Sequence, residues 1–260
     1  MERDKMRQVM IQYQDGIPVT VNTYIAEYGF KKKGYQIERF TLDDVKSWEQ
    51  AKEKDPNDLM FGFMSRYIFV GGTQTLLRIL DLIDVKKPLT YNPQIYLPEY
   101  CKRHIIEMTL GEARKAISAE RKFFIKPAED TKLFSGYVAR SEVDFISLQQ
   151  LPADTKVMIS NIIDIKSEYR CFVNRKQLVG ICHYDGDFTV FPQIDVVLRA
   201  IRSFKDQPIS YTLDFAILND GRMELIEVND GYSLGYCGIH PSIYCQLLED
   251  RWVEITNNKK

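Results

Sequence analysis

Three residues in the last quarter of the sequence give the clearest chemical signal, namely Asp214, Glu227 and Asn229. Each lies within a run of mostly apolar residues, which predicts that the element holding them is largely buried. Two carboxylates and an amide oxygen are hard ligands, suited to a Mg²⁺ ion that also contacts phosphate oxygens. The alternative is a solvated hairpin at a sheet edge, whose acids meet water or arginine partners. This stretch by itself leaves both interpretations open.

The element that would position these residues is a β-hairpin that turns at Asp220-Gly221. Asp-Gly between two β-rich runs is typical of a two-residue loop, in which both residues take positive φ angles. Counting back from such a loop places Asp214 opposite Glu227. Side chains two residues apart share a face, so Asn229 joins them. Opposed carboxylates, about 5 Å apart at Cβ, repel each other and weaken a sheet. A divalent cation between them is the simplest reason to tolerate the pair.

Basic residues upstream could supply the opposite charge. Lys126 ends the apolar run FFIKP and shares a predicted face with Phe124, so its ammonium points where apolar side chains usually lie. Such a lysine either reaches the edge of its sheet or pairs with an anion. Lys132, Ser135 and Gly136 follow in a predicted loop. A loop with a glycine and two flanking lysines is a candidate phosphate cradle.

Glu168 and Arg170 begin another predicted strand, and the alternation of a strand places them on one face. Their simplest interpretation is a surface ion pair of little energetic value. Cys237 and His240 resemble half a zinc site, but no second pair accompanies them. We therefore interpret them as core and loop residues. No Ser-His-Asp or Cys-His arrangement suggests nucleophilic catalysis.

The first ninety or so residues alternate predicted strands and helices, which implies a small parallel sheet. A proline-rich connector, Lys86–Tyr100, then marks the expected boundary between an N-terminal α/β domain (residues 1–100) and a second domain (residues 101–260). Thr109 and Glu112 form a capping-box pattern that opens a helix. Strands dominate the sequence after that helix. We therefore expect a mixed α/β (α+β) fold.

The composition is that of an ordinary globular chain, with 260 residues, 45% hydrophobic and 27% charged, and a formal net charge of −1. That charge gives no general attraction to nucleic acids or anionic lipids. No apolar run reaches membrane-spanning length, and the charged first residues lack a signal-like apolar region. Five cysteines without a CxxC pair are typical of reduced thiols. We therefore expect a cytoplasmic protein with no nucleic-acid or membrane partner.

Taken in order, these pieces resemble the ATP-grasp superfamily, in which ATP lies between two β-rich subdomains. The order is a lysine on a strand, a small loop, a strand–hinge–strand with Glu-x-Arg, an aspartate on a strand and Glu-x-Asn on its partner. The resemblance covers about residues 122–229. The string EVNDGYSLGYCG is similar to a small bacterial and phage clade labelled only as containing an ATP-grasp domain. The resemblance implies an N-terminal pre-ATP-grasp domain followed by two β-rich subdomains.

The resemblance also implies a role for each candidate residue. Lys126 would contact the α- and β-phosphates, and Glu168 would bind the ribose hydroxyls. Arg170 would contact the transferred phosphoryl group or the acyl phosphate, with Lys132 as a second catalytic cation. The remaining implied sets are the phosphate loop (Lys132, Ser135, Gly136), the hinge that reads the adenine edge (Ser160, Asn161, Ile162, Ile163) and the Mg²⁺ ligands (Asp214, Glu227, Asn229).

The implied activity is that of an ATP- and Mg²⁺-dependent ligase, with one or two ions and Mn²⁺ as a substitute. A small-molecule or peptide carboxylate would become an acyl phosphate and be attacked by an amine or thiol, with release of ADP and phosphate. A small-molecule kinase and a non-catalytic ATP-binding module are the alternatives on the same fold. Residues that could line the substrate side, or simply pack, are His183, Tyr184, Tyr232, Ser233 and Tyr236.

Overall fold

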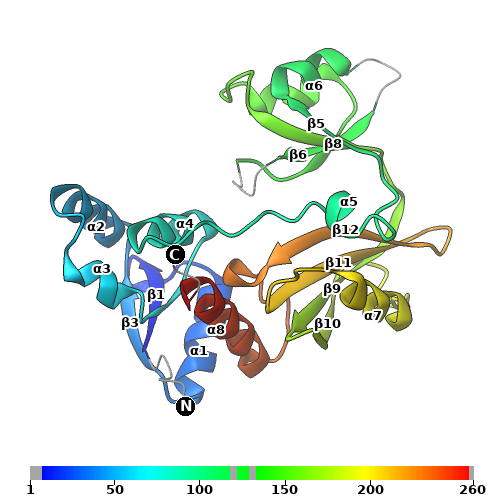
Figure 1. Ribbon diagram of the computed structural model, residues 1–260. Helices are drawn as coiled ribbons and strands as arrows, with labels where there is room; N and C mark the ends of the chain where they lie inside the picture. The colour runs from blue at the N-terminus through cyan, green and yellow to red at the C-terminus, as the bar shows by residue number, and fades with distance from the viewer. Residues whose placement is uncertain (1–7, 118–121, 129–132, 258–260) are drawn as a thin grey trace.

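The computed structural model describes residues 8–117, 122–128 and 133–257. These segments fold into three sheets with helices packed against them, a mixed α/β architecture that confirms the predicted fold class (Figure 1). No helix within the described segments has both the length and the apolar character needed to cross a membrane.

The first sheet is built from N-terminal residues and is parallel at its centre. β1 (Gln8–Gln14) pairs in parallel with β3 (Gln36–Phe40) and with β4 (Ile68–Val70), as the alternation of strands and helices predicts. β2 (Ile17–Pro18) extends β1 with a short antiparallel pairing. Helices cover this sheet, and β1 and β4 are buried along most of their length, as in a parallel sheet with covered faces, whereas β3 is mostly exposed. The helices of this part of the chain are α1 (Val21–Lys32), α2 (Leu42–Lys54), α3 (Leu59–Met64) and α4 (Thr73–Leu82).

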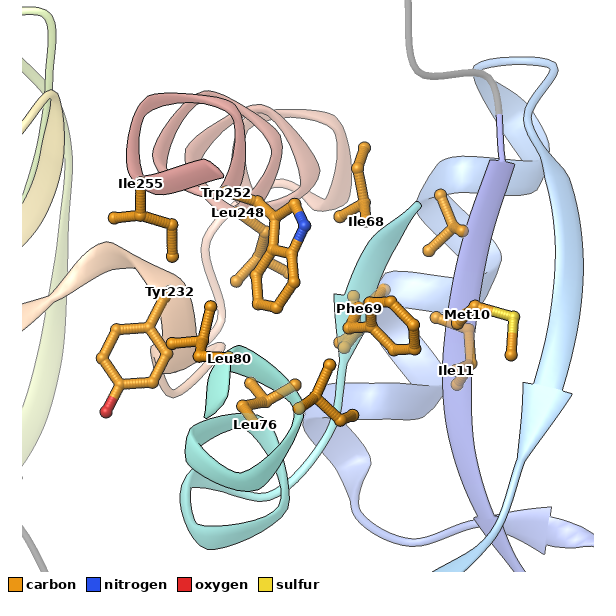
Figure 2. Close-up of a cluster of buried hydrophobic side chains, with 14 of the residues drawn as sticks. Met10, Ile11, Ile68, Phe69, Leu76, Leu80, Tyr232, Leu248, Trp252 and Ile255 are labelled. Carbon is orange, nitrogen blue, oxygen red and sulfur yellow. The ribbon is translucent and has the colours of Figure 1, made fainter. Parts of the chain in front are cut away.

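The last described helix, α8 (Pro241–Asn257), returns to this first sheet and completes its core. Trp252 of α8 is 1% exposed, and its ring centroid lies 5.7 Å from that of Phe69 on β4. Figure 2 shows the indole extending from α8 toward Phe69 of β4 and Leu76 of α4. A buried tryptophan contributes a large apolar area. Residues from opposite ends of the chain therefore share one core.

The second sheet has the strand order β10-β9-β11-β12 and is antiparallel throughout. Its central strand, β11, is buried along its whole length, because β9 and β12 flank it and α7 (Ile194–Ser203) packs in the core on one face. The short helices α5 (Pro93–Tyr96) and η2 (Gly231–Ser233) lie at its margins. The strands are β9 (Ile165–Asn174), β10 (Gln177–Gly186), β11 (Ser210–Leu218) and β12 (Met223–Asp230).

The third sheet, of order β5-β8-β6-β7, has a separate small core with helix α6 (Leu110–Ala116) and the 3₁₀ helix η1 (Glu142–Leu148). The predicted capping box opens α6, because Thr109 and Glu112 each bond the backbone amide of the other. In Figure 1 this sheet lies above the second sheet. Its strands are β5 (Ile105–Thr109), β6 (Phe123–Pro127), β7 (Tyr137–Ala139) and β8 (Lys156–Ser160).

Candidate active site

A cavity of about 680 Å³ opens between the second and third sheets and reaches the N-terminal sheet. Lys126 on β6 reaches it from the third sheet, and Arg170 on β9 reaches it from the second. Residues predicted from distant parts of the sequence therefore meet at one cavity. The predicted site residues that line the cavity are Lys126, Ser135, Gly136, Ser160, Arg170, Tyr184, Glu227, Asn229, Tyr232 and Ser233.

The β11–β12 hairpin places Asp214 directly opposite Glu227, which confirms the predicted register. The predicted two-residue turn is wrong. Of the two predicted turn residues only Gly221 has a positive φ angle, +82°, and the Leu218 amide donates to the Arg222 carbonyl, so the loop has three residues. This is the type I turn followed by a left-handed glycine that ranks second among hairpin loops. An extra residue on β12, between the partners of Asp214 and Phe215, restores the predicted pairing.

A continuous series of polar contacts links the two carboxylates to two cations. Arg170 donates to both oxygens of Asp214, from Nε at 2.9 Å and from Nη2 at 2.6 Å. The Asn229 amide donates to Asp214 Oδ2 at 3.0 Å and to Glu227 Oε2 at 3.3 Å. Lys126 Nζ donates to Glu227 Oε1 at 3.0 Å, which bridges the third sheet to the second. All three predicted metal ligands therefore lie on one face, with Asn229 in contact with both acids. Glu227 and Asn229 line the cavity, whereas Asp214 is 2% exposed and is not among the lining residues.

Arg170 is held on several sides. It is 8% exposed, and its guanidinium lies 5.0 Å from the ring centroid of Tyr184. Tyr184 is the extra residue at an irregularity in β10, and bulges of this kind redirect side chains. The alternative of a surface ion pair between Glu168 and Arg170 does not hold, because Arg170 is buried and bonds Asp214 instead. A bidentate arginine–carboxylate pair fixes orientation as well as charge.

The three carboxyl groups affect each other's ionisation. Burial, with the nearby Asp214 and Glu227 carboxylates, raises the pKa of Glu168 to about 7. Burial also opposes ionisation of Glu227, but the Lys126 ammonium outweighs it and holds the pKa of Glu227 below its ordinary value. Burial disfavours the charged form of Arg170 too, yet its bonds to Asp214 raise the pKa of the guanidinium. The site thus brings three acids close to two cations, Lys126 and Arg170, so acidic groups are in excess.

This donor set fits a divalent cation. Asp214 and Glu227 offer carboxylate oxygens, and a rotation of the Asn229 side chain would present its amide oxygen to the same point, since Asn229 already contacts both acids. Such hard oxygen donors are those that Mg²⁺ takes alongside phosphate. Across the described segments, no three His, Cys, Asp or Glu side chains are grouped so as to hold a metal ion. The predicted set relies instead on two acids and an amide.

The predicted phosphate loop reaches the cavity in part. Gly136 lies directly over β6, where a Cβ atom would come within 2.4 Å of the Phe124 ring and 3.2 Å of the Lys126 Cβ. Only glycine allows this close approach. Ser135 lines the cavity beside it, while Lys132 lies outside the described residues.

The predicted hinge is divided between the cavity and the surface. Ser160, at the end of β8, is 6% exposed and lines the cavity with Met158 and Ile159. Asn161, Ile162 and Ile163 follow β8 and do not line it, and the Ile162 side chain is 43% exposed. Glu168 is likewise outside the lining, although its carboxyl group is close enough to Asp214 and Glu227 to feel their charge. These residues stay predictions as nucleotide contacts.

On the substrate side, three of five predicted residues reach the cavity. Tyr184, Tyr232 and Ser233 line it. His183 does not, because its ring packs against Tyr169, with centroids 5.2 Å apart. Tyr236 packs instead against Tyr244 at 5.6 Å, and its amide donates to Asn22.

Sequence reasoning missed several lining residues. Thr73 at the start of α4 hydrogen-bonds Ser233 through the two hydroxyls, 2.9 Å apart, so the N-terminal sheet contributes to the cavity wall. Arg103 bonds the backbone of β12 at Leu225 and Ile226, and its own amide donates to Glu224. Neither residue belongs to a recognisable motif. Their positions follow only from the packing of elements that are distant in sequence.

A protein-family model matches residues 100–247, and it describes an ATP-grasp domain of the R-2-K clade, family 2. No protein of curated function matches the chain in sequence.

Solved structures share the fold over nearly the whole chain. D-alanine–D-alanine ligase from Bacillus anthracis, complexed with ATP, is 16% identical with a TM-score of 0.50, and the match covers 97% of this chain and 99% of that one. N5-carboxyaminoimidazole synthetase from Staphylococcus aureus, complexed with ADP, is 13% identical with a TM-score of 0.54, over 96% of this chain and 76% of that one. At these identities the likeness shows the fold.

Proposed function

The chain belongs to the ATP-grasp domain family of the R-2-K clade, family 2. On this premise we propose that it is an ATP- and Mg²⁺-dependent ligase. In the proposed reaction ATP phosphorylates a carboxylate to an acyl phosphate, and an amine or thiol then displaces the phosphate. The products are a C–N or C–S bond, ADP and phosphate. The observation that supports the proposal is the series of contacts from Lys126 to Arg170 across one cavity.

Phosphoryl transfer asks the protein mainly for positioning and charge stabilisation. Lys126 would hold the α- and β-phosphates, since its ammonium is anchored at the end of a strand and faces the cavity. Arg170 would contact the transferred phosphoryl group through a guanidinium that Tyr184 orients. Held by Asp214, Glu227 and Asn229, one or two Mg²⁺ or Mn²⁺ ions would neutralise charge on that group.

The rest of the nucleotide site follows from the same cavity. Ser160 and the residues after it would contact the adenine edge, and Glu168 would bind the ribose. Ser135 and Gly136 would cover the phosphates, together with Lys132. The part of the cavity lined by Tyr232, Ser233 and Thr73 would hold the carboxylate substrate and the nucleophile, because its hydroxyl groups can orient both.

Product analysis tests the reaction class. The protein is incubated with ATP, Mg²⁺ and a panel of carboxylic acids, amino acids and peptides, and nucleotide products are separated by ion-exchange chromatography. We expect ADP and phosphate in the presence of a suitable acid and nucleophile. AMP and pyrophosphate would contradict the acyl-phosphate mechanism, and a phosphorylated product without a new C–N or C–S bond would identify a kinase.

Glu227→Gln tests the role of the proposed metal ligand. The substitution keeps shape and hydrogen bonding but removes one charge where phosphoryl charge develops. We expect ADP release to fall by about 10²-fold, equivalent to about 3 kcal/mol, with a much smaller change in ATP affinity. Glu107→Gln, on an exposed position of β5, is the matched control and should leave both unchanged. Equal rates for Glu227→Gln and the wild type would remove Glu227 from the mechanism.

A further inference from the structure

A second cavity, of about 470 Å³, adjoins the first one and takes no part in the proposed nucleotide site. It lies between α2 and α4 on one side and residues 87–91, the first part of the connector, on the other. The residues that line both cavities are Thr90, Tyr91, Val228, Asp230 and Tyr232. Because the same five residues line both cavities, the cavities are neighbours, and a single extended molecule can reach from one to the other.

We propose that the smaller cavity and the connector bind an extended peptide, uncharged or basic, which is the substrate of the ligase. The reacting group of the peptide would lie in the larger cavity, and the adjoining residues would lie in the smaller one. The proposal deepens the ligase function and rests on it for the identity of the reaction, whereas peptide binding is a separate property that can be measured without turnover.

The charges of the smaller cavity disfavour a phosphorylated ligand. Its lining includes the acids Glu49, Asp81 and Asp230 but only two cations, Arg78 and Lys87. Arg78 is already engaged, because its Nε and Nη2 donate to the Glu49 carboxylate at 2.6 and 2.5 Å. Among the described residues, Glu49 and Asp230 are paired with Arg78 and Arg251, which leaves Asp81 and Lys87 as the acid and the cation without a partner. A phosphate site usually gathers more than one cation. With three acids and two cations, this lining suits an uncharged or basic ligand better than an anionic one.

The connector supplies the reason to expect a peptide. Figure 1 shows it as a stretched segment between α4 and α5. Within the described part of the chain, no backbone amide or carbonyl of residues 86–91 is hydrogen-bonded to another residue. An extended segment with free backbone groups can pair with an added peptide strand, whose main-chain bonds give affinity while pockets select side chains. Single amino acids offer too few backbone groups to use this edge.

The smaller cavity can also select side chains. Leu77 on α4 and Leu89 on the connector line it together with Tyr91, whose ring packs against Tyr96 and Phe204. Asp81 lies among the same lining residues, is exposed, and makes no side-chain hydrogen bond or ion pair with another described residue. An apolar floor beside an unpaired carboxylate suits an apolar residue followed by a lysine or arginine.

Fluorescence polarisation tests the proposal directly. The probes are two fluorescein-labelled hexapeptide pools, one built from Gly, Ala, Leu and Lys and the other from Gly, Ala, Leu and Glu. Binding is measured with Mg²⁺ and a non-hydrolysable ATP analogue present. We expect the lysine pool to bind at least 10-fold more tightly than the glutamate pool, and a mixture of free amino acids not to displace it. Equal binding of both pools, or no saturable binding of either, would overturn the proposal.

Leu89→Trp blocks the cavity from a side chain that is 55% exposed, so the fold should tolerate it. We expect it to weaken binding of the lysine pool at least 10-fold and to leave the affinity for the ATP analogue unchanged. Leu59→Trp, at a leucine of α3 that is 77% exposed and outside both cavities, is the matched control and should bind like the wild type. Unchanged peptide binding in Leu89→Trp would also overturn the proposal.

ADP release, measured on the same samples, separates the two claims. A lysine pool that binds as expected but supports no ADP release would contradict the ligase and leave the peptide site standing. ADP release with free amino acids, combined with no binding of either pool, would retain the ligase and remove the peptide site.

Discussion

At the scale of single residues, the protein itself neutralises the carboxylates proposed to hold Mg²⁺. Asp214 is 2% exposed and bonds Arg170 through both oxygens, and Glu227 bonds Lys126. A buried carboxylate without a partner is strongly disfavoured, so these cations stabilise the site before a ligand binds. A metal ion that arrives alone must displace them, whereas nucleotide phosphates offer them a new partner. We therefore expect metal and nucleotide to bind together.

Arg170→Gln tests this competition. It frees both oxygens of Asp214, so we expect Mn²⁺ alone to bind about 10-fold more tightly, a gain of about 1.4 kcal/mol. Affinity for an ATP analogue should fall in the same variant. Electron paramagnetic resonance of Mn²⁺ measures the first quantity without turnover, and calorimetry measures the second.

Arg175→Gln is the matched control for that experiment. Arg175 makes the same two-bond contact with Asp250, at 3.0 and 2.6 Å, but lies outside the cavity. Its removal should leave Mn²⁺ binding unchanged. If Arg170→Gln binds Mn²⁺ no more tightly than Arg175→Gln does, the resident cation does not compete with the metal.

Glu168 should make stability depend on pH. Its pKa is raised from 4.5 to about 7 in the folded protein, so the folded state keeps a proton that the unfolded state loses. Stability therefore falls as pH rises from about 4.5 to 7. Glu168→Gln removes that loss and should stabilise the protein at pH 8 by about 1–2 kcal/mol, a figure reduced for solvent screening, with no gain near pH 4.5. Urea unfolding at pH 4.5, 6 and 8 measures this, and a gain of equal size at all three values would contradict it.

At the scale of elements, the hairpin shows how a correct register can follow from an incorrect turn. The loop has one residue more than predicted, and the extra residue on β12 compensates for it before Asp214 is reached. Burial explains the outcome. A slip of one residue would turn every apolar side chain of β11 to the other face, so the apolar pattern fixes the pairing more strongly than the loop does.

The loop geometry gives a stability prediction. Gly221 has a φ angle of +82°, in a region that side chains with a Cβ atom rarely adopt, and a Cβ there would meet no other atom within 4 Å. We expect Gly221→Ala to lower the free energy of unfolding by about 1 kcal/mol, and Gly221→Asn to lower it less, because asparagine tolerates this region. Urea unfolding of the two variants measures the difference. Equal stability of the wild type and Gly221→Ala would show that the turn changes type.

The limits of sequence reasoning are also set at this scale. Alternation along single strands placed Lys126, Asp214 and Glu227, because a buried sheet leaves one orientation for each residue. It could not place His183 and Tyr184, since an irregularity in β10 decides which of them reaches the cavity. The partner of Arg170 was also hidden, because cross-strand neighbours depend on strand order rather than on sequence distance.

At the scale of the whole molecule, the predicted parallel sheet and β-rich region are present, but the return of α8 to the first sheet had no sequence signal. The sequence of an apolar helix at this position does not show which of the sheets it packs against. The buried pair Arg251–Asp230, at 2.6 Å, also ties this helix to the end of β12. The proposed metal ligands on β12 are therefore fixed relative to the N-terminal core.

Trp252→Ala tests how much the first sheet depends on α8. Removing a fully buried indole leaves a large cavity, and we expect a loss of about 3–5 kcal/mol in the free energy of unfolding. Phe63→Ala, at a ring of α3 that is 55% exposed, should cost less than about 0.5 kcal/mol. Urea unfolding followed by circular dichroism compares the two. A loss below about 1 kcal/mol in Trp252→Ala would show that the sheet is stable without this contact.

The position of α8 also sets an order of events during synthesis. The N-terminal strands leave the ribosome first, yet their core stays open until residues 241–257 have followed them. Domains usually fold one after another as they emerge from the ribosome. The ribosome adds about 5–20 residues per second. Here the earliest-made sheet must wait on the order of ten seconds or more for its last helix, with Ile68, Phe69 and Leu76 exposed meanwhile. The nascent chain is therefore a natural client for chaperones that shield apolar segments until residues 241–257 have been made.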